Sequence, residues 1–258
     1  MRFRIANRLP ALTTMCAVGL LITACGGESP VVKVVTASAS GAPASTAAPT
    51  STLGASTCAA FARTADPFLL RVVDKQRGLP ADYRPADLQV FDDRWAVPGF
   101  PGQSMRAMAT GPMVEMLSAA QAQGVQLRIK SSFRSYGDQV QTFQYWVNLL
   151  GEAQARRESA PPGNSEHQLG TTADVISAKS GTGWELVEEF ASLPEGKWLA
   201  AHAAEFGFAI SYPKNGEAIT GYVYEPWHVR YLGKPCAADW QSSGLVLVQF
   251  LERMAAPR

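Results

Sequence analysis

Two short stretches of the sequence hold side chains that could bind a metal ion. The first contains His167 and, seven residues later, Asp174; the second contains His228, with Glu225 three residues before it. Two imidazoles and a carboxylate can hold zinc and leave a fourth position open for water. A second carboxylate beside that water would supply the base that a hydrolase needs. The residue types therefore indicate a catalytic metal site, with ordinary packing histidines as the alternative.

The third histidine of the chain and the glutamate beside His167 are given no part in such a site. His202 falls in a stretch that predicts a helix and has no carboxylate partner in a recognisable zinc motif, so we interpret it as structural. Glu166 neighbours a candidate ligand, but adjacency in sequence does not determine where a side chain points. We therefore leave Glu166 without a role.

Short helices and strands must position these residues. The patterns predict helices over residues 59–72 (broken at Asp66-Pro67), 105–123, 138–157, 184–191 and 196–206. They predict strands over residues 125–131, 175–176, 208–212, 221–224 and 227–231. Because helices and strands are mixed without a βαβ rhythm, we predict an α+β fold with a small, mostly antiparallel sheet flanked by helices.

The N-terminus has the features of a bacterial secretion signal. Arg2, Arg4 and Arg8 precede an apolar run over residues 9–24 that is too short to span a bilayer comfortably. The run ends in Leu21-Ile22-Thr23-Ala24-Cys25, which resembles the lipobox of bacterial lipoproteins. The resemblance implies a signal peptide over residues 1–24 and attachment of lipid to Cys25, whose acyl chains would anchor the protein in a membrane. The alternative is ordinary signal cleavage, which leaves a free cysteine.

Residues 25–56 and 57–258 differ in composition. The first segment is mostly Ala, Ser, Thr, Pro and Gly without aromatic residues, a composition that cannot form a core. We interpret it as a disordered linker that follows the lipidated cysteine, either a tether into the cell wall or a spacer of no particular reach. The second segment is long enough for one folded domain. The net charge of +1 argues against nucleic acid as a partner.

Two cysteines lie at opposite ends of the predicted domain. Cys58 is close to its beginning and Cys236 close to its end. Outside the cytoplasm, a pair of cysteines is more often a disulfide than two thiols. We therefore predict a bridge between Cys58 and Cys236, with two independent buried thiols as the alternative.

The motif Ser165-x-His167-x-x-Gly170-x-x-x-Asp174, together with Glu225-x-Trp227-His228, resembles the VanY-type family of zinc D-alanyl-D-alanine carboxypeptidases. The resemblance covers about residues 72–233. It includes further motifs in the same order, namely Leu79-Pro80-x-x-Tyr83, Ser132-Phe133-Arg134-Ser135-Tyr136-x-x-Gln139, Trp198-Leu199, Gly207-Phe208, Tyr212-Pro213 and Thr220-Gly221-Tyr222-x-Tyr224.

The resemblance implies a fold and a set of site residues. The fold is the one that this family shares with the Hedgehog signalling domain. His167, Asp174 and His228 are implied to be the ligands of one zinc ion per chain, and Glu225 to be the catalytic base. Arg134 matches an arginine of the family's active site that steadies the substrate or developing negative charge. The alternative for Arg134 is a surface ion pair at a strand end.

Five other side chains could bind the substrate, and each has a structural alternative. Ser165 could hydrogen-bond a ligand or form a turn. Gln139 and Tyr136 could line the substrate cleft or start the helix that follows them. Tyr212 and Trp227 could wall the pocket or pack in the core.

The implied activity is hydrolysis of the terminal D-Ala-D-Ala bond of peptidoglycan stem peptides. Thr172 and Ser132 depart from the family pattern, which usually has alanine at the first position and often glycine at the second, so the shape of the subsites is open. The implied enzyme is a monomeric lipoprotein of the bacterial cell envelope that faces outward from the cytoplasmic membrane. Alternatives are an L,D-carboxypeptidase or a peptidoglycan endopeptidase with the same zinc centre. A zinc-containing wall-binding module without turnover is a further alternative, and Glu225 argues against it because a structural site needs no base.

Overall fold

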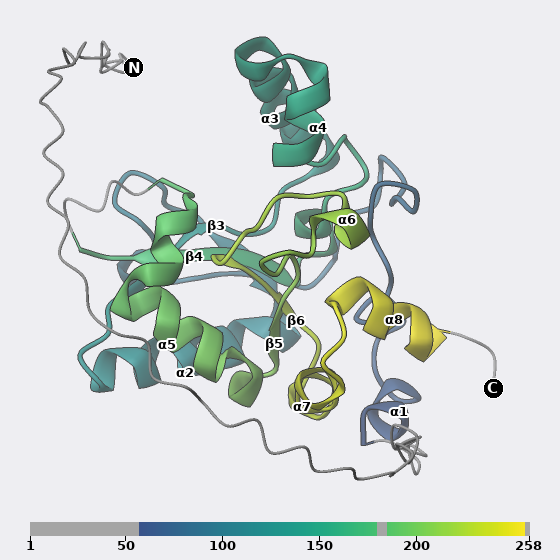
Figure 1. Ribbon diagram of the computed structural model, residues 1–258. Helices are drawn as coiled ribbons and strands as arrows, with labels where there is room; N and C mark the ends of the chain where they lie inside the picture. The colour runs from purple at the N-terminus through teal and green to yellow at the C-terminus, as the bar shows by residue number, and fades with distance from the viewer. Residues whose placement is uncertain (1–56, 180–184, 256–258) are drawn as a thin grey trace, which may run out of the picture. The chain divides into compact units, whose positions relative to one another are not determined.

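The computed structural model describes residues 57–179 and 185–255 (Figure 1). The predicted signal peptide, the lipid site at Cys25 and the linker lie outside the described residues and stay predictions. The helices are α1 (Thr57–Ala62), α2 (Ala107–Ala122), α3 (Tyr136–Leu150), α4 (Glu152–Glu158), α5 (Pro194–His202), α6 (Glu217–Thr220), α7 (Lys234–Ser243) and α8 (Leu247–Ala255). The 3-10 helices are η1 (Asp93–Trp95), η2 (Glu166–Leu169), η3 (Glu188–Ser192) and η4 (Ala203–Phe206). None of the described helices is long and apolar enough to cross a membrane.

The strands form two antiparallel sheets. The strands are β1 (Leu88–Val90), β2 (Ser104–Arg106), β3 (Leu127–Ser131), β4 (Thr172–Ser177), β5 (Phe208–Ile210) and β6 (His228–Tyr231). The smaller sheet pairs β1 with β2, and the larger has the order β3-β4-β6-β5. The α+β fold with a small antiparallel sheet is therefore confirmed.

Helices α2 and α5 cover one face of the larger sheet (Figure 1). The core between them contains Met113 and Met116 of α2, Leu199 of α5, and Val175 and Val229 of the central strands. Successive side chains of a strand point to opposite faces. The residues next to these valines, which include Asp174 and His228, therefore lie on the other face of the sheet.

Two of the predicted elements differ because glycine changes the direction of the backbone. The helix predicted over residues 138–157 is divided into α3 and α4 at Gly151, whose φ is +78°. The strand predicted over residues 221–224 is wrong. Gly221 ends α6 in the left-handed conformation, and the amide of Tyr222 then donates a hydrogen bond to the hydroxyl of Thr220.

Three predicted helices are shorter or more irregular than expected. The first ends at Ala62, because Asp66 accepts a hydrogen bond from the amide of Phe68 and forms a turn around Pro67. The helix predicted over residues 184–191 is wrong among the described residues, where only the 3-10 helix η3 is found. The helix predicted over residues 196–206 passes from α5 into η4 after His202.

The two ends of the folded domain are joined by a disulfide between Cys58 of α1 and Cys236 of α7, which are 178 positions apart. Both cysteines are fully buried and belong to a second apolar cluster with Leu232, Leu247 and Phe250. This cluster joins α1 to α7 and α8 (Figure 1). The disulfide therefore fixes the entry of the chain to its exit.

We expect the double variant Cys58→Ser, Cys236→Ser to lose about 2–5 kcal/mol of unfolding free energy, because the unfolded chain regains the freedom that a long closed loop denies it. Urea unfolding of the domain, monitored by circular dichroism, measures the difference. The single variants control for the serine hydroxyls. Equal stability of the double variant and the oxidised wild type would contradict the prediction.

Candidate metal centre

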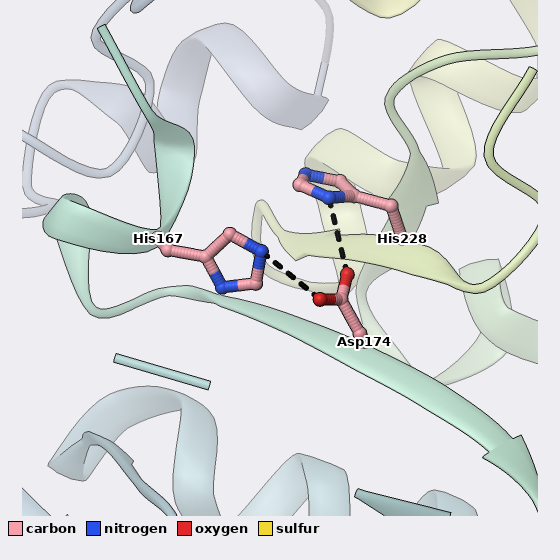
Figure 2. A group of neighbouring side chains, drawn as sticks. All are labelled: His167, Asp174 and His228. Carbon is pink, nitrogen blue, oxygen red and sulfur yellow. Dashed lines mark ion pairs between the residues drawn. The ribbon is translucent and has the colours of Figure 1, made fainter. Parts of the chain in front are cut away.

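Three buried side chains meet on the polar face of the larger sheet (Figure 2). His167 Nε2 lies 3.3 Å from Asp174 Oδ2, and His228 Nδ1 lies 3.3 Å from Asp174 Oδ1. One ligand atom from each residue can be chosen so that all three lie within 4.8 Å of one another. Each imidazole thus approaches a different oxygen of the same carboxylate, and the three side chains surround one point.

The register of the sheet places two of the three. Asp174 on β4 and His228 on β6 are directly opposite each other in the antiparallel ladder. Residues in such a pair point to the same face of a sheet. An aspartate and a histidine far apart in the sequence are therefore neighbours as soon as these strands pair.

A tight turn places His167. The 3-10 helix η2 carries this histidine and ends at Gly170, whose φ is +74°. A Cβ atom at Gly170 would lie 2.9 Å from Arg106 Cγ and 3.0 Å from Pro85 Cγ. Only glycine therefore suits both the backbone conformation and the space, and the chain turns there from η2 into β4.

Each histidine also makes a hydrogen bond on the side of its ring that faces away from the cluster. His167 Nδ1 is 2.7 Å from the carbonyl oxygen of Ser132. His228 Nε2 is 3.1 Å from Glu166 Oε2. Metal-bound histidines commonly use the second ring nitrogen in this way, because the bond orients the ring.

The charged groups around the cluster shift one another's pKa values. Burial alone would raise the pKa of Asp174, but His167 and His228 hold it far below its usual value. Burial opposes the charged form of His228, but the carboxylates of Asp174, Glu166 and Glu225 raise its pKa well above the ordinary range. Three buried carboxylates therefore surround His228, and Arg230 is a further cation paired with one of them, Glu166.

These residues fit a divalent metal ion. Asp174 Oδ1 is buried without a hydrogen-bond partner, although His228 Nδ1 lies nearby. A buried oxygen without a partner is costly, and coordination of a cation would remove that cost. Two imidazoles with one carboxylate are typical of zinc sites that keep a position open.

The cluster opens into a cavity that also contains Glu225 and Arg134. Glu225 Oε2 is 3.2 Å from His228 Nδ1, and burial raises the pKa of Glu225 above its usual value. Burial lowers the pKa of Arg134, against the attraction of Asp174 and Glu225. The Nε atom of Arg134 is buried without a hydrogen-bond partner. The cavity therefore offers a carboxylate for proton transfer and a cationic donor for an anionic group.

Three of the five predicted substrate contacts line this cavity and two do not. Ser165, Tyr212 and Trp227 are among its walls. Gln139 is buried and is not among the walls, but its amide donates at 2.6 Å to the carbonyl of Ala160, which is a wall residue. Tyr136, also absent from these walls, lies against Gly163. Both residues lie in the first turns of α3, and the alternative given for them was that they start this helix.

Several residues around the site have no role in the sequence analysis. Glu166 and Arg230 form a fully buried ion pair at 2.7 Å, and Ser211 donates to Glu166 at 2.6 Å. Burial would raise the pKa of Glu166, but Arg230 and His228 lower it to about 2. Arg230 could have been found from the sequence, because it follows His228 by two residues on a predicted strand and must share its face. Glu166 gave no such signal.

One wall of the cavity comes from the hairpin of α3 and α4, which stands away from the larger sheet (Figure 1). Thr142 and Trp146 of α3 and Glu158 of α4 line it. They are too far from the histidine motifs in sequence to have been linked to the site by spacing.

A protein-family model described as VanY, D-alanyl-D-alanine carboxypeptidase, matches residues 102–234 of the chain. This range includes the metal cluster, Glu225 and Arg134. The Bacillus subtilis protein YodJ is 40% identical over 187 residues, which cover 72% of this chain and 68% of YodJ.

Solved structures agree with the sequence relatives. The LdcB LD-carboxypeptidase is 40% identical with a TM-score of 0.64, over 71% of this chain and 86% of that chain. The vancomycin resistance D,D-pentapeptidase VanY, solved in complex with Zn(II), is 27% identical with a TM-score of 0.59, over 71% of this chain and 99% of that chain. The chain therefore has the fold of these peptidases.

Proposed function

The chain belongs to the VanY family of D-alanyl-D-alanine carboxypeptidases, and from this premise we propose that it is a zinc enzyme that removes the terminal D-amino acid from peptidoglycan stem peptides in the cell envelope. The observation that carries the proposal is the buried cluster of His167, Asp174 and His228, with Glu225 beside it in the same cavity. The Zn(II) complex of the similar VanY structure supports the choice of metal.

His167, Asp174 and His228 would hold the ion. When bound, zinc would lower the pKa of a water ligand to about 7 and polarise the scissile carbonyl group. The hydrogen bond from His167 to the carbonyl of Ser132 orients the ring so that Nε2 faces the ion. The hydrogen bond from His228 to Glu166 orients the second ring so that Nδ1 faces the ion. The chain thus supplies three ligands whose rings are fixed before the metal arrives.

Glu225 is the residue placed to transfer protons. Its carboxylate is 3.2 Å from His228 Nδ1 and therefore close to where water would lie. In the proposed reaction Glu225 accepts a proton from the attacking water and returns it to the nitrogen of the leaving D-amino acid. A pKa raised by burial suits this role, because the carboxylate must hold the proton between the two steps.

Arg134 is the residue placed to bind negative charge. Its guanidinium is buried in the cavity wall with Nε unpartnered. A planar guanidinium presents several N–H donors in a fixed fork, so it can bind a peptide carboxylate or the oxyanion that forms at the scissile carbonyl. The first interaction would favour a substrate whose free C-terminus enters the cavity, and the second would stabilise the transition state.

Two peptide bonds are candidates for cleavage at this site. Likeness to the VanY D,D-pentapeptidase supports cleavage of the terminal D-Ala-D-Ala bond of a pentapeptide. The greater identity to the LdcB LD-carboxypeptidase supports the alternative, in which the bond between an L-residue and a terminal D-alanine of a tetrapeptide is cut. The same cluster, base and arginine would serve both reactions.

Incubation of the zinc-loaded protein with muropeptides that end in tetrapeptides or pentapeptides, followed by mass spectrometry, tests the proposal. We expect loss of one D-alanine from at least one of the two. Loss from pentapeptides alone supports D,D specificity, and loss from tetrapeptides alone supports L,D specificity. Absence of hydrolysis for both would overturn the enzymatic proposal and favour a wall-binding module.

The variant His228→Ala is expected to lose stoichiometric zinc, because two ligands remain and a buried metal site needs at least three. Elemental analysis of desalted protein measures the content. The control is His202→Ala, because His202 is bonded to Glu205 at 2.9 Å and does not belong to the cluster. Undiminished zinc in His228→Ala would refute the ligand assignment.

A further inference from the structure

Behind His228, on the side away from the cavity opening, lies a buried polar network centred on Glu166. Both oxygens of this carboxylate have partners. Oε1 accepts from Arg230 Nη1 at 2.7 Å. Oε2 accepts from Ser211 Oγ at 2.6 Å and lies 3.1 Å from His228 Nε2. Protein groups thus hold both oxygens of the carboxylate, and no metal ion is needed to fix it.

Arg230 in turn is held by the segment that leads into the domain. Its Nη2 atom donates to the carbonyl oxygen of Leu69 at 3.1 Å and to that of Arg71. Arg230 has no exposed surface, so its charge depends entirely on these acceptors and on Glu166. A buried charge is tolerated only when it is paired and hydrogen-bonded, and this one is both. The cation therefore locks Glu166 in place.

The network determines which nitrogen of His228 carries hydrogen. An ionised carboxylate can only accept hydrogen bonds, and Ser211 already occupies Oε2 as a donor. Nε2 of His228 must therefore be the N–H nitrogen, because two acceptors would repel each other. The imidazole that binds a metal is neutral and has one N–H, so Nδ1 then offers its lone pair to the ion, and Nδ1 is the atom that faces Asp174.

The two histidines of the cluster are oriented by different kinds of acceptor. His167 is bonded to a neutral backbone carbonyl, that of Ser132, which directly follows β3. His228 is bonded to a charged side chain, which can be changed by substitution without altering the backbone. Hydrogen bonds to charged groups are about twice as strong as neutral ones. A single substitution can therefore disturb the orientation of His228, whereas the orientation of His167 depends on the backbone.

We propose that Glu166 is a positioning residue that fixes the orientation and tautomer of His228 for metal binding, and that Arg230 and Ser211 hold Glu166 in place for this task. The proposal rests on the zinc site of the proposed function. It requires only that zinc binds, so it can be judged whether or not the expected peptides are hydrolysed.

The variant Glu166→Gln tests this role because its amide cannot satisfy both neighbours. If the amide NH₂ of the glutamine faces His228, it meets the N–H on Nε2 of the imidazole, and two donors oppose each other. The imidazole can avoid this only by moving its hydrogen to Nδ1, the nitrogen that should bind zinc. If the amide NH₂ faces Arg230 instead, it meets the N–H donors of the guanidinium. We expect about 10- to 100-fold weaker zinc binding, measured by competition with a chromophoric chelator.

A tautomer measurement separates positioning from mere stability. The chain has three histidines, so ¹⁵N-histidine NMR of the zinc-loaded protein can assign each ring. We expect a sharp, slowly exchanging Nε2–H signal of His228 in the wild type, because Glu166 accepts that hydrogen, and a broadened, faster-exchanging signal in Glu166→Gln. Unchanged zinc affinity together with an unchanged Nε2–H signal would overturn the proposal.

The matched control is Glu195→Gln. Glu195 is as buried as Glu166 and is paired with Lys179 at 2.9 Å, and its ion pair does not involve the cluster. We expect this variant to keep the zinc affinity of the wild type, and an equal loss in both variants would overturn the specific role of Glu166.

Should Glu166→Gln fail to fold, Ser211→Ala removes one bond to the same oxygen and keeps the ion pair. We expect it to weaken zinc binding by a smaller factor, and no change would count against the proposal.

The outcomes distinguish this inference from the proposed function. A wild type that binds zinc tightly but cleaves no stem peptide, with weakened zinc in Glu166→Gln, would remove the enzymatic proposal and leave the positioning role intact. Hydrolysis by the wild type, with unchanged zinc affinity in Glu166→Gln, would leave the enzymatic proposal and remove the positioning role. Absence of zinc binding in the wild type would overturn both.

Discussion

Replacement of Glu225 by alanine is expected to lower the kcat of peptide hydrolysis by about 100- to 10,000-fold, the usual contribution of a general acid–base group. The carboxylate lies 3.2 Å from His228 Nδ1 but is not needed to complete the cluster of two histidines and one aspartate. Zinc should therefore remain bound. Steady-state kinetics on the muropeptide that the wild type cleaves, together with elemental analysis of the same sample, measures both effects.

The variant Glu225→Gln serves as the control for shape, because it keeps the size of the side chain and removes its basicity. Equal loss of kcat in both variants indicates that proton transfer is the missing step. Near-normal turnover by either variant would refute the role of Glu225 as the base. Loss of zinc from both would show that this carboxylate belongs to the metal site instead.

Replacement of Arg134 by methionine is expected to reduce kcat/KM by about 100- to 1000-fold, comparable to the removal of one donor from an oxyanion hole. The guanidinium lies buried in the cavity wall with Nε unpartnered, so a substrate anion would be its hydrogen-bond acceptor. Arg134→Lys should restore little of the activity, because an ammonium group lacks the planar fork. Kinetics of both variants with zinc content verified measures the effect.

The division between kcat and KM tells which anion Arg134 binds. A fall in kcat with little change in KM indicates the oxyanion of the transition state, whereas a rise in KM with little change in kcat indicates the terminal carboxylate. The control is Arg94→Met, because Arg94 is exposed and is not part of the cavity wall. Full activity of Arg134→Met would show that neither anion is bound there.

The three members of the cluster could be predicted from the sequence because the chemistry of metal binding restricts the choice of residue. Few side chains bind zinc, and His167, Asp174 and His228 lie in motifs that resemble a known family. The pairing of β4 with β6 then makes neighbours of Asp174 and His228, which a prediction of short antiparallel strands allows but does not specify. The general arrangement of the site was thus accessible before the structure.

Residues whose role depends on the direction of a side chain were not accessible. Gln139 is close to Arg134 in sequence, but its buried amide bonds the carbonyl of Ala160 in the cavity wall and does not itself line the cavity. Glu166 was set aside because a residue beside a ligand could point either way. Glu166 lies in η2 and its partner Arg230 in β6, and only the completed fold brings the two charges together. Trp146 likewise lines the cavity only because the completed fold places α3 beside the cluster.

The disulfide between Cys58 and Cys236 also determines how mechanical force would pass through the domain. When the chain is pulled between the segment ahead of Thr57 and the segment after Cys236, the tension reaches Cys58 and is carried across the covalent bond to α7. The residues between the two cysteines are bypassed, and among them are Leu69 and Arg71, whose carbonyls hold Arg230 behind the metal cluster. Reduction of the bond would send the same tension along the backbone to those carbonyls. The oxidised bridge therefore isolates the geometry of the metal site from a pull on the N-terminal end of the chain.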